Sequence, residues 1–232
     1  MTARLTTLLL LLTALPASAE SGDEQRLDLT GITTISITGD ASSIALTTAD
    51  APFEATLGGR RSGWFANWYS AFFASDCRSA GRMRVEGGTL HVDVGAPWPD
   101  TSDCVVALKA NLPKASTVTI QQAAAQVSLD GDFSAVSLDS KAADISFRGH
   151  ASSLLLKGDA LRSNLTFDKV DNTETIALDA RALDVTLGFV AGTKVSYKVE
   201  AGAALVDSVL PNTLGAKPAI DIKASFLRAH IE

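Results

Sequence analysis

The feature that most constrains the fold of this chain is a short repeat in its second half. An apolar residue, a small residue and a second apolar residue recur about every nine or ten residues. Alternation with a period of two is typical of a strand that buries one face. Strands this short bury that face only by stacking on neighbours. The units are Val118-Thr-Ile120, Val127-Ser-Leu129, Val136-Ser-Leu138, Ile145-Ser-Phe147, Leu154-Leu-Leu156, Leu165-Thr-Phe167, Ile176-Ala-Leu178, Val185-Thr-Leu187 and Val195-Ser-Tyr197.

Alternate units are expected to lie on opposite sides of a thin core, with two strands in each coil of 18–22 residues. The N-terminal units Ile35-Ser-Ile37 and Ile44-Ala-Leu46 begin the same pattern. The sequence therefore predicts an all-β, single-domain β-solenoid, and the alternative is an antiparallel β-sandwich, which also suits strands at this spacing. The expected sheets are Val118, Val136, Leu154, Ile176 and Val195 on one side, and Val127, Ile145, Leu165, Val185 and Leu205 on the other.

Residues 1–19 have the pattern of a secretory signal peptide. Arg4 precedes an apolar stretch, and Ala17-Ser-Ala19 supplies the small residues that a signal peptidase needs. The apolar stretch has about half of the roughly 20 residues that a membrane span requires. We therefore expect cleavage after Ala19, a domain at 20–232 with no transmembrane segment, and a periplasmic or secreted location. In an exported chain, the two cysteines, Cys77 and Cys104, predict one disulfide.

An aromatic insertion at residues 60–82 interrupts the strands. If residues 62–75 are helical, six rings fall on one half of the helix surface. One interpretation is a cap that closes the solenoid, and the other is a binding surface. The rings are Trp64, Phe65, Trp68, Tyr69, Phe72 and Phe73, and the candidate binding residues are Arg60, Arg61, Trp64, Trp68, Tyr69 and Arg78.

The sequence offers no catalytic, metal or cofactor motif. The formal net charge of -6 argues against a nucleic-acid partner. His91, His150 and His230 share no ligand spacing, and no G-x-S-x-G motif marks a nucleophilic serine. Many aspartates lie near the ends of the repeat units, where they satisfy turn backbone. We therefore expect no enzyme activity, no metal site and no cofactor.

Two segments resemble a known family. They are Leu108-Lys-Ala-Asn-Leu-Pro-Lys-Ala-Ser-Thr-Val-Thr-Ile120, with the repeats to about Leu187, and Val85-Glu-Gly-Gly-Thr-Leu-His-Val92. Over about residues 30–230 the chain is similar to a bacterial exported putative-adhesin family of β-strand-repeat proteins. The resemblance implies export and a β-solenoid fold. It transfers no catalytic or binding residues.

The sequence supports two classes of function. The first is a non-enzymatic protein with a scaffold or adhesin-like role in the cell envelope, whose partner is an envelope protein or a glycan. The alternative is a polysaccharide-active lyase or hydrolase on a β-helical fold. An enzyme would need a cleft where carboxylates and a basic residue converge, whereas a scaffold would present flat faces.

Overall fold

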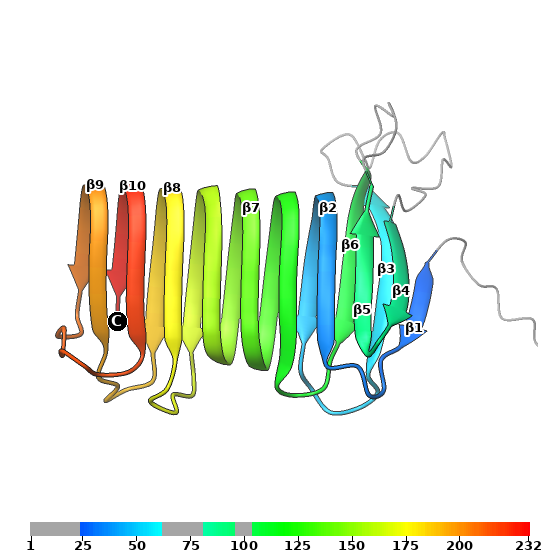
Figure 1. Ribbon diagram of the computed structural model, residues 1–232, viewed down its shortest axis with the longest axis horizontal. Helices are drawn as coiled ribbons and strands as arrows, with labels where there is room; N and C mark the ends of the chain where they lie inside the picture. Colours follow the sequence, from blue (N-terminus) through cyan, green and yellow to red (C-terminus); the bar gives the residue numbers. More distant parts are fainter. Residues whose placement is uncertain (1–23, 62–80, 96–103) are drawn as a thin grey trace, which may run out of the picture.

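The computed structural model describes residues 24–61, 81–95 and 104–232 (Figure 1). These ranges form an all-β fold, in which no helix is long and apolar enough to cross a membrane. The strands belong to one 10-stranded sheet, in which β4 and β5 branch from the main order β1-β3-β6-β2-β7-β8-β10-β9. Their bounds are β1 Gln25–Asp28, β2 Thr34–Thr47, β3 Glu54–Arg61, β4 Gly81–Glu86, β5 Thr89–Val94, β6 Cys104–Asn111, β7 Ser116–Phe167, β8 Thr175–Phe189, β9 Ser196–Ser208 and β10 Ala219–Ile231.

The long strand β7 winds through successive coils of a solenoid, and the other coils stack on it in parallel (Figure 1). At its beginning, Val118 pairs with Ile35 of β2. Near its end, Leu154 pairs with Ile176 of β8. This parallel stacking confirms the predicted solenoid. Antiparallel pairing occurs only near the N-terminal end of the described sheet, where β3 pairs with β1 and β6, and β4 pairs with β5.

Stacking places equivalent side chains of successive coils in columns. Inward columns are mainly apolar, and they include three fully buried phenylalanines, Phe133, Phe147 and Phe167. The ring centroids of Phe147 and Phe167 are 5.1 Å apart, and Phe167 stacks on Phe189 at 5.2 Å. The thin core predicted from the repeat is thus continuous along the solenoid.

Glycine turns a corner of the coil at two stacked positions. Gly131 and Gly149 have φ angles of 128° and 126°, a region that side chains rarely adopt. A Cβ on Gly149 would also lie 2.1 Å from the carbonyl oxygen of Gly131. These two glycines therefore allow one coil to lie directly on the next.

The C-terminal strand β10 lies between β8 and β9, so the last two coils are exchanged relative to chain order. Ile176 pairs with Ile220, and Ile220 pairs with Tyr197. The prediction that Val195 stacks next to Ile176 is therefore wrong. The physical reason is apolar content, because burial favours the strand with the larger apolar side chains. The inner strand buries Ile220, Ile222, Leu227, Ala229 and Ile231, whereas the paired positions of β9 hold Tyr197, Val199, Ala204, Val206 and Ser208.

One predicted core residue and one predicted pairing are also wrong. Leu205 is 66% exposed, because it points outward from the edge strand β9. Leu165 pairs with Leu187 rather than with Val185, whose partner is Ser163. Ser163 occupies an inward position. Because its side chain is polar, the apolar pattern of the sequence begins only at Leu165 and misses this position.

The predicted insertion is shorter than expected. Arg60 and Arg61 belong to β3, where they pair with Val105 and Cys104 of β6. At the other end, β4 already begins at Gly81. Residues 62–80, and with them the predicted helix, lie outside the described residues.

The strand order predicts unequal effects of two substitutions at paired positions. Ile222→Ala removes a fully buried side chain between β8 and β9, so unfolding should become easier by about 2–5 kcal/mol. Val199→Ala, at the paired position on the edge strand, should cost well under half of that. Urea denaturation of both variants measures the difference. An order of β8-β9-β10 would instead make Val199 the more costly position.

Candidate functional site

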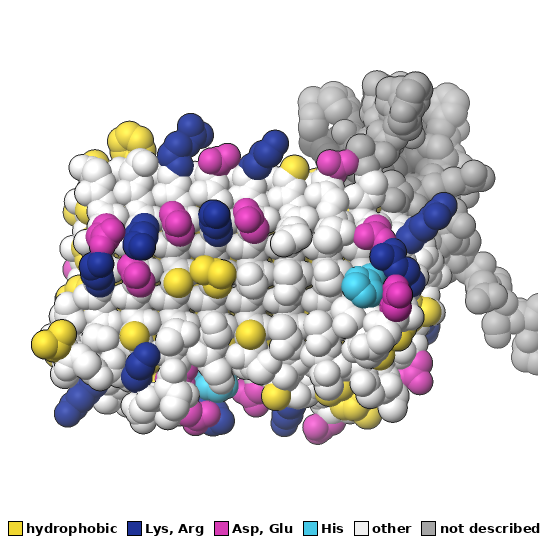
Figure 2. Space-filling view, in the orientation of Figure 1, with side chains coloured by type: hydrophobic (Ala, Val, Ile, Leu, Met, Phe, Trp, Pro, Cys, Tyr) yellow, Lys and Arg dark blue, Asp and Glu magenta, His cyan; other side chains and the backbone are white. Residues whose placement is uncertain are grey.

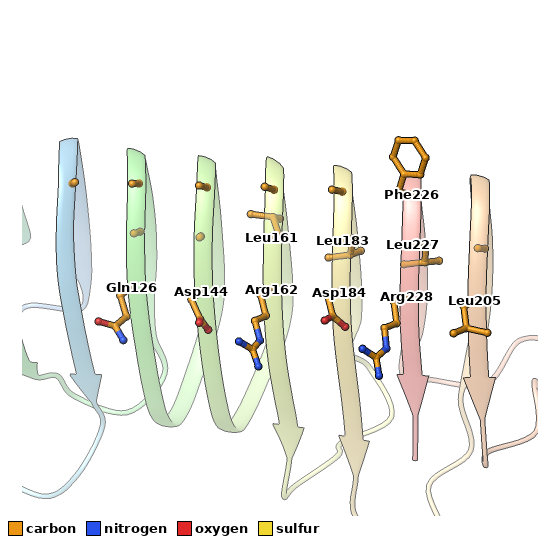
Figure 3. Close-up of a pocket in the computed structure, with 18 of the residues that line it drawn as sticks. Gln126, Asp144, Leu161, Arg162, Leu183, Asp184, Leu205, Phe226, Leu227 and Arg228 are labelled. Carbon is orange, nitrogen blue, oxygen red and sulfur yellow. The ribbon is translucent and has the colours of Figure 1, made fainter.

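An outward column of alanines runs along one edge of the solenoid. The register pairs Ala41 with Ala124 and Ala160 with Ala182. All members of the column are exposed, and they line a shallow groove of about 920 Å³ (Figure 3). We call this the alanine groove, and its column consists of Ala41, Ala124, Ala142, Ala160, Ala182 and Ala203.

Two large apolar side chains protrude at the C-terminal end of the alanine groove. Phe226 takes the place of an alanine in the column, between Ala182 and Ala203, and it is 65% exposed. Leu205, which pairs in register with Arg228 on the edge strand β9, is 66% exposed. An exposed ring next to a floor of small residues forms an apolar surface whose burial by a partner is favourable.

A row of charged side chains forms one wall of the groove. Consecutive coils present Gln126, Asp144, Arg162, Asp184, Arg228 and Leu205, which Figure 3 shows side by side. Arg162 and Arg228 both pair in register with Asp184. Among the described residues, neither arginine has a carboxylate oxygen within 4.0 Å. The wall therefore offers two guanidinium groups and two carboxylates to a ligand.

The alternation of charge first serves the fold. Neighbouring coils are about 4.8 Å apart, and like charges directly opposite one another destabilise a sheet. The same alternation of charge occurs on the opposite face, where Figure 2 shows a row of alternating acidic and basic side chains. There the register pairs Lys157 with Asp179, Asp179 with Lys223, and Lys223 with Glu200. Alternation alone therefore does not distinguish the groove, but its apolar floor does.

A second cluster joins a loop to the core. His150 Nε2 lies 3.2 Å from Glu174 Oε1 and 3.5 Å from Asp171 Oδ2. Glu174 is fully buried and accepts hydrogen bonds from the backbone N–H groups of Asp171 and Thr173. Burial acts to raise the pKa of Glu174, but these backbone donors and His150 outweigh it, so the pKa is lowered. The carboxylate is therefore held in its charged form.

This cluster has the elements of a cation site. The imidazole of His150 and the carboxylates of Asp171 and Glu174 offer ligand atoms within 4.8 Å of one another. However, the Lys169 ammonium lies 3.0 Å from Asp171 Oδ2, and backbone donors already satisfy Glu174. The arrangement is thus complete as an ion-pair network that fixes the loop between β7 and β8.

Most residues selected from the sequence fall outside the described part of the chain. Of the candidate binding residues, Trp64, Trp68, Tyr69 and Arg78 are outside the described residues, as is Cys77. Arg60, Arg61 and Cys104 are described only by their backbone positions in β3 and β6. Hence the predicted binding surface and the disulfide stay predictions.

Sequence reasoning missed both the alanine groove and the His150 cluster. A signal for the groove was present, because an alanine recurs 18 residues apart at positions 124, 142 and 160. It was hidden because these alanines lie at the bends between the apolar units and are not part of the units themselves. The histidine cluster gave no such signal, because it depends on a loop that returns to the preceding coil.

Comparisons with known proteins find similar chains among solved structures. No family model and no curated protein match the sequence. A solved structure of a putative cell adhesion protein from Clostridium sporogenes is 10% identical, with a TM-score of 0.48, and the match covers 90% of this chain and 98% of that one. A putative adhesin from Parabacteroides distasonis is 11% identical, with a TM-score of 0.41, and the match covers 90% of this chain and 96% of that one. A putative adhesin from Bacteroides fragilis is 10% identical, with a TM-score of 0.32, and the match covers 90% of this chain and 95% of that one. Because all three TM-scores are below 0.5, we infer no function from these similarities.

The lowered pKa of Glu174 predicts a pH-dependent contribution to stability. A carboxylate with a depressed folded-state pKa stabilises the fold above its unfolded pKa and loses this effect as pH falls through the folded value. Glu174→Gln should therefore lower the free energy of unfolding by about 1–3 kcal/mol at neutral pH and by progressively less below about pH 4. Denaturant titrations across this pH range measure the effect.

The matched control is Glu86→Gln, which changes an exposed carboxylate in β4. It should leave the stability unchanged at every pH. An equal loss for Glu174→Gln at neutral and acidic pH would show that its charge is not what stabilises the loop.

Proposed function

We propose that this chain is a non-enzymatic, exported β-solenoid with a scaffold or adhesin-like binding role in the cell envelope. The alanine groove is its binding surface. The observation that carries this proposal is the outward apolar column, with Phe226 and Leu205 exposed at its C-terminal end. It runs beside two arginines that have no carboxylate partner in the described part of the chain. Aromatic and arginine side chains are the residue types that dominate binding energy at protein interfaces.

The rigidity of the scaffold supports the same role. Side chains in the groove come from successive coils of one continuous parallel stack, so their spacing is set by backbone hydrogen bonds. A preorganised surface loses little conformational entropy on binding. A long, shallow groove of this kind fits an extended partner surface better than a small substrate.

Export is part of the proposal and rests on the sequence. The pattern of residues 1–19 favours a cleaved signal peptide, and Cys77 and Cys104 would then form a disulfide outside the cytoplasm. Mass spectrometry of the exported protein should identify Glu20 as the first residue and show no free thiol before reduction. An intact N-terminus at Met1 would contradict export by this route.

Binding by the groove predicts a loss of retention on cell-envelope fragments. Phe226→Ser and Arg162→Glu should each reduce retention of the purified protein at least tenfold, because they remove an exposed ring and reverse a charge in the groove. The matched control is Lys157→Glu, the same reversal on the opposite face. Melting temperatures should show that all three variants fold. Equal loss in the control would mean that general charge, and not the groove, controls retention.

A specific observation keeps the alternative function open to test. Asp144 and Asp184 lie on the same face as Arg162 and Arg228, around a hollow of about 1040 Å³. A polysaccharide lyase or hydrolase needs carboxylates and proton-transfer groups in one cleft. Incubation with acidic polysaccharides would then release new reducing ends, and Arg162→Ala would abolish that release. The binding proposal expects no release from the wild-type protein.

A further inference from the structure

The row of charges along the alanine groove is complementary to the same row of a second copy that runs in the opposite direction. Along the stack, the charges run negative, positive, negative, positive in Asp144, Arg162, Asp184 and Arg228 (Figure 3). Consider a second copy turned by 180° about an axis parallel to the strands, above the gap between Arg162 and Asp184. Arg162 then faces Asp184 of the second copy, and Asp144 faces its Arg228. Both kinds of pair occur twice, and no like charges meet.

The same rotation matches the apolar column. The alanine column of one copy faces that of the other, since the axis runs along the strands. Phe226, which is 65% exposed, then faces Ala142 of the second copy, and Leu205 faces its Gln126. A protruding ring is thus placed over the smallest side chain of the opposing column, so the two surfaces can approach closely.

The outward column beyond the charged row is also compatible. Asn164 pairs in register with Thr186, and Thr186 with His230. Under the rotation, Asn164 faces Thr186 of the second copy, so a carboxamide meets a hydroxyl and each can donate or accept a hydrogen bond. All three columns are therefore compatible with this axis position.

We propose that the alanine groove binds a second copy of this chain, in a two-fold symmetric, face-to-face dimer. This inference rests on the proposed function, because it names the partner of the same surface. Five steps from Gln126 to Leu205 span about 24 Å, and a face about 20 Å wide gives roughly 500 Å² from each copy. That is near the lower limit of specific interfaces, so the dimer should dissociate on dilution.

Sedimentation velocity of the purified protein over a concentration series tests the proposal. The wild-type protein should show a reversible monomer–dimer equilibrium that weakens as salt rises. Arg162→Asp and Phe226→Ser should each raise the dissociation constant at least tenfold. Lys157→Asp, the matched reversal on the opposite face, should leave that constant unchanged.

A charge exchange separates the interface from the fold. Arg162→Asp combined with Asp184→Arg places like charges on neighbouring coils. The new carboxylate lies beside Asp144 and the new guanidinium beside Arg228, so the melting temperature should fall. The pairs between copies keep opposite signs, however, so dimerisation should return to the wild-type level. Recovery of the dimer together with lower stability is the result expected only of a contact between copies.

Three outcomes would overturn the dimer. One is a wild-type protein that stays monomeric over the whole concentration range. Another is a dimer that Arg162→Asp and Phe226→Ser leave intact, as pairing through the edge strand β9 would. The last is a charge exchange that does not restore association. If the protein is monomeric but groove variants still lose retention on envelope fragments, the proposed binding surface stands and only the choice of partner is wrong.

Discussion

The core columns, the alanine groove and the charged rows all depend on in-register parallel stacking, in which equivalent residues of successive coils lie about 4.8 Å apart. Stacking converts a short repeat in sequence into columns of side chains. Inward columns are mainly apolar, because a polar side chain there must find a partner inside the core. Ser42 donates a hydrogen bond to Gln122, whereas the Ser163 hydroxyl is buried and has no hydrogen bond among the described residues. Outward columns must avoid like charges, and this produces the alternating rows on both faces.

The same constraint explains the exchanged coils at the C-terminal end. A solenoid has an end coil, and whichever strand occupies it loses half of its stacking partners. β9 carries alanine and glycine at its bend, whereas β10 carries isoleucine and leucine at most inward positions. Placing β10 inside buries the more apolar strand and leaves the less apolar one at the edge. Phe226 and Leu205 remain exposed because they point outward from these two strands.

The parts of the fold that depend on local pattern could be predicted, and those that depend on competition between strands could not. Units such as Val118-Thr-Ile120 indicated the solenoid because alternation is a local property. The order of β9 and β10 depends on which of two strands, more than 20 residues apart in register, occupies the inner coil next to β8. The predicted pairing of Leu165 with Val185 was wrong because Ser163, the partner of Val185, interrupts the apolar pattern. The groove was missed because alanine is ordinary in sequence and becomes informative only when it is stacked.

The alanine groove and both charged rows are built from one register, the in-register stack with β10 inside it. Cross-strand cysteine pairs measure that register directly. Ala177→Cys with Asp221→Cys joins neighbouring coils about 4.8 Å apart, within the range of about 4.4–6.8 Å for disulfides. Ala177→Cys with Lys198→Cys spans two coils, about 9.6 Å. Peptide mapping of the oxidised variants should find a disulfide in the first pair only, and a disulfide in the second pair alone would contradict the stack.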